Sequence, residues 1–302
     1  MATSGAVVGG ALARPLRAER HGDRSAASLL VLGALWFTLL FAVAALVALL
    51  VDSFVAGFPR LDANLFTQYA SRLFPERAGA RAAILGSMWV IATTALLAIP
   101  LGVAAAVYLE EFADPARWYN RLIEVNLQNL AAVPAIIYGM LTAGFALAIG
   151  LRRGVLLAGG IALALLILPV IIISAREALR AVPAEIRQGS LALGASPLRT
   201  VWHQTLPAAV PGVATGTILA LSRALGEAAP LLLLGGLVFV TYDPDGLMSG
   251  FTTMPIQIFG WAGQPQVEFQ TLASATIIVL LGMLLLMNAL AIVIRNRYQK
   301  RW

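Results

Sequence analysis

Hydrophobic and polar positions along this chain fall into long blocks. Six apolar blocks cover residues 29–51, 82–109, 122–149, 155–174, 207–240 and 272–294. A helix needs roughly 20 apolar residues to cross a bilayer. The first block exceeds the roughly 7–15 residues of a signal-peptide core, so it is expected to be a retained span. The pattern predicts an all-α integral membrane protein with six transmembrane helices. One polytopic domain, 29–294, would lie between an N-terminal tail, 1–28, and a short C-terminal tail, 295–302.

Proline and glycine interrupt two of these blocks. Pro100 lies in the second block and Pro230 in the fifth. Both residue types are tolerated in membrane spans when neighbouring helices satisfy the freed backbone groups. Six spans would place both termini on the same side of the membrane.

Basic residues indicate which side this is. Most of the 21 Lys and Arg residues lie in segments on the side of the termini. They are Arg14, Arg17, Arg20, Arg24, Arg117, Arg121, Arg176, Arg180, Arg187, Arg199, Arg295, Arg297, Lys300 and Arg301. The other side carries Arg60, Arg72, Arg77, Arg81, Arg152 and Arg153. Because the side richer in Lys and Arg is usually cytoplasmic, both termini and segment 175–206 are predicted to be cytoplasmic. The net charge of +6 reflects this bias and does not indicate nucleic-acid binding.

Composition agrees with a membrane protein and argues against an enzyme. Hydrophobic residues make up 60% of the chain and charged residues 12%, against about 25% charged residues in soluble domains. There is no cysteine, and the two histidines, His21 and His203, lie in polar segments. The only lysine is Lys300, so a GxxxxGK[ST] nucleotide-binding loop is absent. We therefore expect no cofactor or metal, and we expect any ATPase to be a separate polypeptide.

Two charges stand out in the apolar stretch SRALGEAAPLLLLGG, residues 222–236. Arg223 and Glu227 are four residues apart, which places them on one face of a helix. An arginine deep in a span costs at least about 2.5 kcal/mol, so it needs a partner or water. The pair could be structural. Alternatively, Arg223 could bind an oxyanion through its planar guanidinium, with Glu227 tempering its charge.

Other polar residues are weaker candidates for a substrate pathway. Ser222 could donate a hydrogen bond, although a span serine usually bonds its own helix backbone. Asn126, Gln128 and Asn129 could line a pathway or bond between helices. In VPAIIYG, Pro134 and Tyr138 suggest a bend with an interfacial or pore-facing ring.

The cytoplasmic segment 175–206 does not resemble a plain connector. Residues 184–193 favour a helix, with Pro183 suited to its start and Gly194 to its end. A second short segment covers 196–205, and Pro207 is expected to open the fifth span. The segment is either a solvated loop on the lipid headgroups or a compact knob that a partner grips.

The spacing around Gly194 resembles the cytoplasmic signature loop of ABC importer permeases. That pattern is E-A-A, three residues, G, nine residues, I-x-L-P. Gly194 and Leu206-Pro207 match it, whereas Gln188, Gly189 and Ser190 replace E-A-A and Gln204 replaces isoleucine. The resemblance implies that the loop docks into a groove of an ATPase subunit. The expected contact residues are Glu185, Gln188, Gly189, Ser190, Leu191, Gly194 and Ala195.

A more specific resemblance extends from about residue 82 to the end of the chain. The chain resembles the A-type permease subunit of phosphate ABC transporters, the PstA family, in six blocks that occur in the family's order. They are YLEEFA (108–113), IEVNLQNLAAVPAIIYG (123–139), SLALGASPLRTVWHQTLPAAVPG (190–212), ALSRALGEAAPLL (220–232), FTTMPIQIFGWAGQP (251–265) and LLLMNALAIVIRNRYQ (284–299). The sister permease subunit of the same transporters shares the VP-x-I-x-YG and R-x-x-G-E-x-x-P elements.

This resemblance implies a type I ABC importer permease fold in the bacterial cytoplasmic (inner) membrane. It also implies a heterodimer with the sister permease, a dimer of ATPase subunits and an extracytoplasmic phosphate-binding protein. Inorganic phosphate would be the substrate, and Arg223 with Glu227 would contribute to its pathway.

Acidic residues suggest two further contacts. Asp243, Asp245 and Glu268 lie in the outer segment 241–268, which has no basic residue. We expect this segment to touch the binding protein rather than to capture phosphate. Glu110 and Glu111, at the end of the second span, lie either beside the signature loop or in solvent.

Two alternatives stay open. In an ion-coupled secondary transporter, Glu227 would relay protons beside Arg223. That hypothesis gives no reason for a structured knob at 184–206, and it predicts uptake without ATP. The other alternative is an ABC permease for a different oxyanion, because the choice of phosphate rests on the resemblance.

Overall fold

The computed structural model describes residues 26–152, 154–236 and 239–298. The chain divides into two units, one ending at Val51 and the other starting at Asp52. Within the described ranges the secondary structure is helical, and the only β contact is an isolated bridge between Val155 and Gly250. The predicted all-α fold is therefore confirmed. Arg14, Arg17, Arg20, Arg24, Arg153, Lys300 and Arg301 lie outside the described residues, as does most of the predicted N-terminal tail.

Helix α1 (Ala26–Gly57) contains the first predicted span and continues beyond it. The helix has no charged residue before Asp52. Thr38 donates its hydroxyl to the Leu35 carbonyl at 2.9 Å, so this polar group is satisfied within the helix. These features suit a helix surrounded by lipid.

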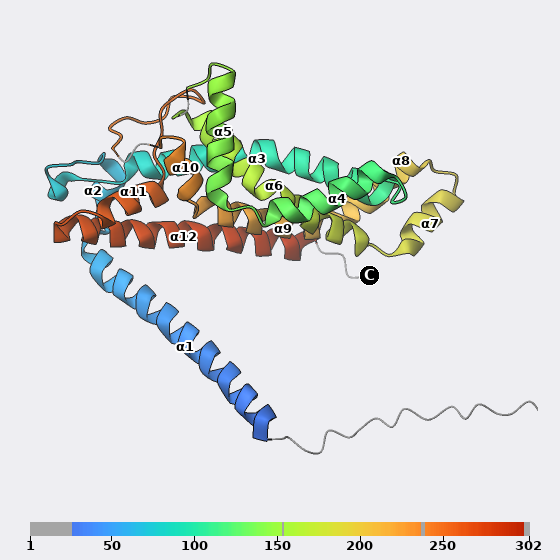
Figure 1. Cartoon of the computed structure of the whole chain (residues 1–302), viewed down its shortest axis with the longest axis horizontal. Helices are drawn as coiled ribbons and strands as arrows, with labels where there is room; N and C mark the ends of the chain where they lie inside the picture. Colours follow the sequence, from blue (N-terminus) through green and yellow to red (C-terminus); the bar gives the residue numbers. More distant parts are fainter. Residues whose placement is uncertain (1–25, 153, 237–238, 299–302) are drawn as a thin grey trace, which may run out of the picture. The chain divides into compact units, whose positions relative to one another are not determined.

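The second unit is built of further helices (Figure 1). The α-helices are α2 (Ala63–Thr67), α3 (Arg81–Val107), α4 (Trp118–Ala131), α5 (Ala135–Ala148), α6 (Leu156–Arg180), α7 (Ala184–Ala192), α8 (Pro197–Thr200), α9 (Leu206–Leu225), α10 (Ala229–Leu233), α11 (Met254–Ala262) and α12 (Val267–Tyr298). Two 3₁₀ turns, η1 (Phe58–Arg60) and η2 (Pro75–Arg77), and two π-helical turns, η3 (Tyr108–Phe112) and η4 (Val201–Thr205), complete the unit.

Helix α6 forms the centre of this unit. It packs against α3 and α9, and its Leu163, Ile167 and Ile171 are almost completely buried. Close approach depends on small residues, because a Cβ at Gly160 would collide with the Thr93 side chain. The Thr94 hydroxyl donates to the Gly160 carbonyl at 3.2 Å. Small residues and inter-helix hydrogen bonds of this kind are typical of membrane helix packing.

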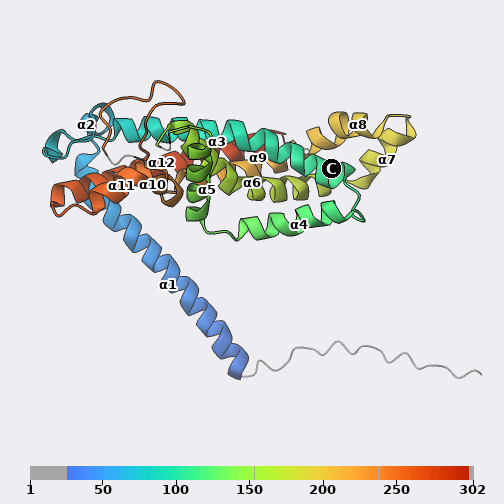
Figure 2. The same ribbon diagram turned by 45° about the horizontal axis from the view of Figure 1, so that its top comes forward.

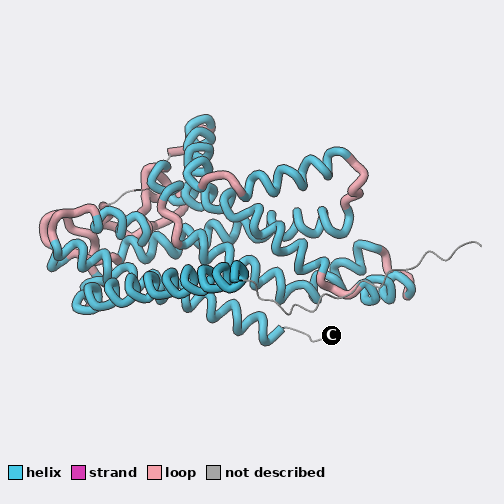
Figure 3. Tube along the Cα trace, turned by 60° about the horizontal axis from the view of Figure 1, so that its bottom comes forward, coloured by secondary structure: helices cyan, strands magenta, loops and turns pink. Residues whose placement is uncertain are grey.

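The predicted third span, 122–149, is not one continuous helix. It divides into α4 and α5, and the path of the chain bends by 111° between them. Figure 3 shows the short loop that separates the two helices. Pro134 lies at the break and cannot donate a backbone hydrogen bond. The buried Tyr138 donates its hydroxyl to the Leu130 carbonyl at 2.7 Å. Pro134 stands four residues after Leu130 and has no N–H to donate, and the Leu130 carbonyl accepts the Val133 amide and the Tyr138 hydroxyl instead.

The predicted fifth span, 207–240, has different limits in the structure. Helix α9 ends at Leu225, Gly226 follows as its C-cap, and the short α10 comes after it. At its N-terminal side, α9 is continuous with η4 and α8, so the whole helix begins at Pro197. Pro207 therefore does not open the helix. The π-turn before it absorbs the backbone disruption that a proline causes inside a helix.

The remaining spans also extend beyond their predicted limits. Helix α6 continues to Arg180, six residues into the predicted cytoplasmic segment, and α12 covers Val267–Tyr298. Five helices of the described part are long and apolar enough to cross a membrane, and a sixth span results if the bent pair α4 and α5 is counted as one.

Candidate functional site

Helices α7 and α8 form a compact knob, placed at one end of the second unit (Figure 2). Gly194 ends the turn after α7 with a φ of +81°, a conformation that favours glycine. Ser196 caps α8 by accepting a hydrogen bond from the Arg199 amide at 3.3 Å. The hydroxyls of Ser190 and Thr200 lie 2.9 Å apart and join the two helices. The two short helices that the sequence indicated are therefore present, and they form a structured knob, which was one of the two alternatives.

A groove of about 580 Å³ opens between α7 and the α8–η4 segment. Five of the predicted ATPase-contact residues line it: Glu185, Gly189, Ser190, Gly194 and Ala195. Gln188 and Leu191 lie on the exposed surface of α7. Leu193, at the tip of the knob, is 91% exposed. An apolar tip beside a polar groove is a surface that suits a protein partner.

Arg187 attaches α7 to the membrane helices. Its guanidinium binds the Glu111 carboxylate, with the shortest distance 2.7 Å, and it donates to the carbonyls of Leu179 at 2.7 Å and Val182 at 2.8 Å. The side chains of Arg187 and Glu111 are 23% and 10% exposed. Arg187 thus connects α7 with the ends of both α3 and α6. We call this set of contacts the Arg187 tether.

A second ionic cluster lies beside the tether. Arg176 and Arg180, on α6, both bind Glu110, at 3.2 and 2.9 Å. Arg176 also binds Glu124, on α4, at 2.6 Å. The cluster therefore joins α3, α4 and α6 next to the base of the knob.

Both clusters depend on the π-turn η3, which carries Glu110 and Glu111. Sequence alone left two options for these residues, and the structure excludes the solvated one. It also shows that Arg176, Arg180 and Arg187 bind these glutamates, whereas their sequence positions indicated only the side of the membrane on which they lie. The available clue was the opposite charges that follow the second and fourth predicted spans, at ends predicted to lie on the same side of the membrane.

Arg223 and Glu227 lie near each other but are not tightly paired. Their Nε and Oε1 atoms are 3.8 Å apart, and the two side chains are 56% and 24% exposed. Because α9 ends at Leu225, Glu227 lies beyond the helix, so the expectation that both residues share one helix face is wrong. Arg223 keeps N–H groups available for another acceptor.

The other predicted pathway residues are dispersed. Ser222 donates to the Asn288 side chain on α12 at 2.9 Å, instead of bonding its own helix backbone as expected. Asn126 donates to the Leu122 carbonyl of its own helix at 2.8 Å, and Asn129 is exposed. Within the described ranges, no hydrogen bond or ion pair joins either asparagine to Arg223 or Glu227.

The outer segment differs from its sequence-based description. Asp243 binds Arg81, with an Nη2–Oδ2 distance of 2.6 Å, and these hydrogen bonds lower the pKa of the Asp243 carboxyl. Asp243 is therefore engaged within the chain, whereas Asp245 is exposed. Arg72 also reaches this region, where its guanidinium lies 4.9 Å from the centre of the Phe239 ring. The segment has no basic residue of its own, but the fold brings arginines to it.

Comparison with known proteins gives a consistent family. Residues 98–301 match the family described as "Binding-protein-dependent transport system inner membrane component". The chain is 31% identical to "Phosphate transport system permease protein PstA" of Yersinia pestis, over 85% of this chain and 86% of that protein. It is 32% identical to "Probable ABC transporter permease protein YqgI" of Bacillus subtilis, over 72% and 73% of the two chains.

A solved structure shows the same fold. A chain of a bacterial alginate ABC transporter, crystallised with its alginate-bound periplasmic protein, superimposes with a TM-score of 0.65 and 15% identity. The match covers 91% of this chain and 96% of that one. The helical fold of this chain is therefore one found in ABC transporters.

Proposed function

Because this chain belongs to the family of binding-protein-dependent transport system inner membrane components, we propose that it is a permease subunit of an ATP-driven importer of inorganic phosphate. It is a multi-pass inner-membrane protein and a transport component. The observation that carries the proposal is its 31% identity to a phosphate permease over most of both chains. The groove at the α7–α8 knob supports the ATP-driven part of it.

The knob would dock into a cytoplasmic ATPase subunit. Its contact surface would consist of the groove residues and the exposed positions Gln188 and Leu191. Gln188 keeps a hydrogen-bonding side chain where the family pattern has glutamate. The apolar tip at Leu193 adds buried area on docking.

Movement of the docked knob would reach the membrane through the Arg187 tether. Arg187 pulls on Glu111 at the end of α3 and on the carbonyls that end α6. The neighbouring Glu110 cluster passes the displacement to α4 through Glu124. Ion pairs with several hydrogen bonds suit this task because they hold a fixed geometry.

The remaining parts of the importer follow from the family. The subunit would pair with a sister permease, stand above a dimer of ATPase subunits and receive phosphate from an extracytoplasmic binding protein. Both termini and the knob would face the cytoplasm.

Within the membrane, Arg223 would contribute to the phosphate pathway. Its guanidinium can bind phosphate oxygens and stays charged at any physiological pH. The loose contact with Glu227 would temper this attraction, so that phosphate is released again. Ser222, Asn126 and Asn129 are secondary candidates, since Ser222 and Asn126 already have partners within the chain.

Reconstitution tests the proposal. The chain would be purified with the subunits that accompany it, placed in liposomes with the binding protein, and assayed for uptake of labelled phosphate. We expect uptake that needs ATP and is blocked by unlabelled phosphate but not by sulfate or molybdate. Competition by sulfate or molybdate would instead indicate another oxyanion. Uptake that ignores ATP and follows a proton gradient would indicate a secondary transporter.

A further inference from the structure

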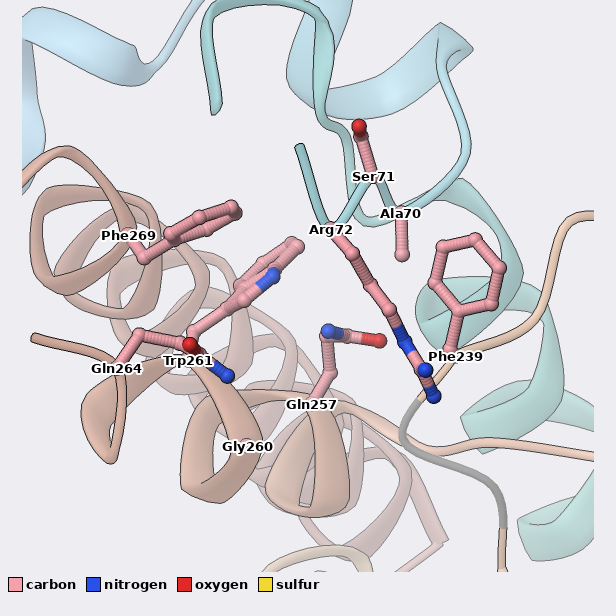
Figure 4. Close-up of a pocket in the computed structure, with 9 residues that line it drawn as sticks. All are labelled: Ala70, Ser71, Arg72, Phe239, Gln257, Gly260, Trp261, Gln264 and Phe269. Carbon is pink, nitrogen blue, oxygen red and sulfur yellow. The ribbon is translucent and has the colours of Figure 1, made fainter. Parts of the chain in front are cut away.

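A cavity of about 280 Å³ lies at the end of the second unit opposite the knob. The residues that line it come from the loop after α2, from the segment between α10 and α11, from α11 and the turn after it, and from the start of α12 (Figure 4). In the proposed orientation this end faces the outside of the cell. We call this space the outer cavity.

Two side chains at the outer cavity are almost completely buried, and their polar groups have no hydrogen-bond partner among the described residues. Gln257 is 2% exposed, and its side-chain amide forms no hydrogen bond with any other described residue, although its backbone N–H donates to the Thr253 carbonyl. Figure 4 shows this amide in the space between Trp261 and Arg72. Trp261 is 3% exposed, and its indole N–H likewise has no partner among the described residues. Both side chains line the cavity, so their N–H groups can donate to a molecule bound there.

A positive charge completes the set of donors. Arg72 reaches the outer cavity from the loop after α2, with its guanidinium 4.9 Å from the centre of the Phe239 ring. None of the residues lining the cavity is acidic. In the described part of the chain, no carboxylate lies within 4 Å of the Arg72 guanidinium. The nearby Arg81 is different, because Asp243 neutralises it.

We propose that the outer cavity binds an oxyanion, and specifically inorganic phosphate, before it enters the membrane pathway. This inference rests on the proposed function for its substrate and its orientation. Arg72 provides the charge, the aromatic face of Phe239 holds its guanidinium, and Gln257 and Trp261 provide neutral N–H donors. Donors that converge from different elements suit an anion with oxygens on all sides.

The test measures equilibrium binding of labelled phosphate to the transporter purified without its binding protein. An Arg223→Gln background removes the proposed pathway site. Arg72→Gln should weaken phosphate binding at least tenfold, and Gln257→Glu should abolish it by placing a negative charge beside the anion. Arg77→Gln and Gln68→Glu are the matched controls, since both residues are exposed and neither lines the cavity. Both controls should bind like the background.

Two results would overturn the inference. One is equal phosphate binding with and without Arg72. The other is unchanged phosphate binding combined with a lower affinity for the binding protein, which would mean that the cavity receives a carboxylate of that partner. ATP-driven uptake by the wild-type complex is measured separately, so a failure of the proposed function is distinguishable from a failure of the cavity.

Discussion

Arg223 occupies a position where local electrostatics favour a cation. It lies in the last turn of α9, and a helix C-terminus attracts positive charge. With Glu227 at 3.8 Å, the guanidinium keeps hydrogen-bonding capacity for a substrate oxygen. We predict that Arg223→Gln lowers ATP-driven phosphate uptake at least tenfold in liposomes. Removal of one charge-assisted contact is worth about 1.5–3 kcal/mol, which corresponds to a loss of this size.

Assembly must be intact for this result to count. Size-exclusion chromatography of the variant should give the same complex as the wild type. Arg121→Gln is the matched control, because Arg121 is an exposed arginine outside the proposed pathway, and it should retain normal uptake. Wild-type uptake by an assembled Arg223→Gln complex would exclude a transport role for this residue.

Asp243 predicts a pH dependence in the outer segment. Hydrogen bonds from Arg81 lower the pKa of its carboxyl below the ordinary value of about 3.9. A carboxyl whose pKa is lower in the folded state stabilises that state at pH values above its ordinary pKa. This stabilisation is lost as the pH falls through the pKa of the folded state. We expect hydrogen exchange around residues 241–253 to accelerate, relative to its intrinsic rate, on acidification below about pH 4.

Asp243→Asn should remove this pH dependence, because an asparagine does not titrate. Asp245→Asn should preserve it, since Asp245 is exposed and has no ion pair within the described residues. An unchanged acid response in Asp243→Asn would assign the effect to a different group.

At the scale of single elements, α7 depends on its tether. Arg187→Gln leaves Glu111, only 10% exposed, without its cation. Loss of one partner from a buried ion pair typically costs about 3–5 kcal/mol, and partial exposure of Arg187 places the expected cost at the lower end. We predict faster hydrogen exchange in α7 and a lower ratio of phosphate transported to ATP hydrolysed.

A second substitution distinguishes the cost of the unpaired Glu111 charge from the cost of losing the tether. Glu111→Gln in the Arg187→Gln background should recover part of the lost protection, because the unpaired carboxylate is gone. Arg117→Gln serves as the control, since its ion pair with Asp114 is exposed to solvent and surface ion pairs contribute little to stability. An unchanged ratio of phosphate transported to ATP hydrolysed in Arg187→Gln would mean that movement of the knob reaches the membrane helices through other contacts.

Two glycines of the knob make a matched pair. A Cβ would meet nothing within 4 Å at Gly189 or at Gly194, so steric space does not distinguish them. Gly189 lies inside α7, whereas Gly194 has a φ of +81°. Gly189→Ala should stabilise α7 by about 0.5–1 kcal/mol, and Gly194→Ala should destabilise the knob by about 1–2 kcal/mol. Hydrogen exchange of α7 amides measures both, and effects of the same sign would contradict the prediction.

Long apolar blocks are sufficient to predict most of these elements, because a helix in lipid must satisfy its own backbone. Gly194 was also predictable, since a helix-ending glycine acts locally. Pro134 and Tyr138 indicated a bend where α4 and α5 separate, but not the hydrogen bond from the Tyr138 hydroxyl to the Leu130 carbonyl. The ion pair between Arg81 and Asp243 was not predictable from the sequence, because the two residues are 162 positions apart. Local pattern does not encode such contacts.

At the scale of the whole second unit, its two ends have different chemistry. Helices α7 and α8 lie at one end and α2 and α11 at the other (Figure 1). The tether joins α7 to the ends of α3 and α6, whereas the outer cavity is lined by the loop after α2 and by α11. An importer needs this asymmetry, because ATP acts on one side and the substrate arrives on the other. The proposed function therefore requires that the knob face the cytoplasm and the outer cavity face the outside of the cell.

The chain has no cysteine, so one introduced thiol reports the side on which it lies. Leu73→Cys, at a position 80% exposed in the outer loop, should react with a membrane-impermeant maleimide only in right-side-out vesicles. Leu193→Cys in the knob should react only in inside-out vesicles. Ala116→Cys lies in the loop between η3 and α4, and it should also react only in inside-out vesicles, even when a docked ATPase covers the knob. The opposite labelling pattern would place the knob outside the cell, away from ATP. It would overturn both the coupling role of α7 and the outward position of the cavity.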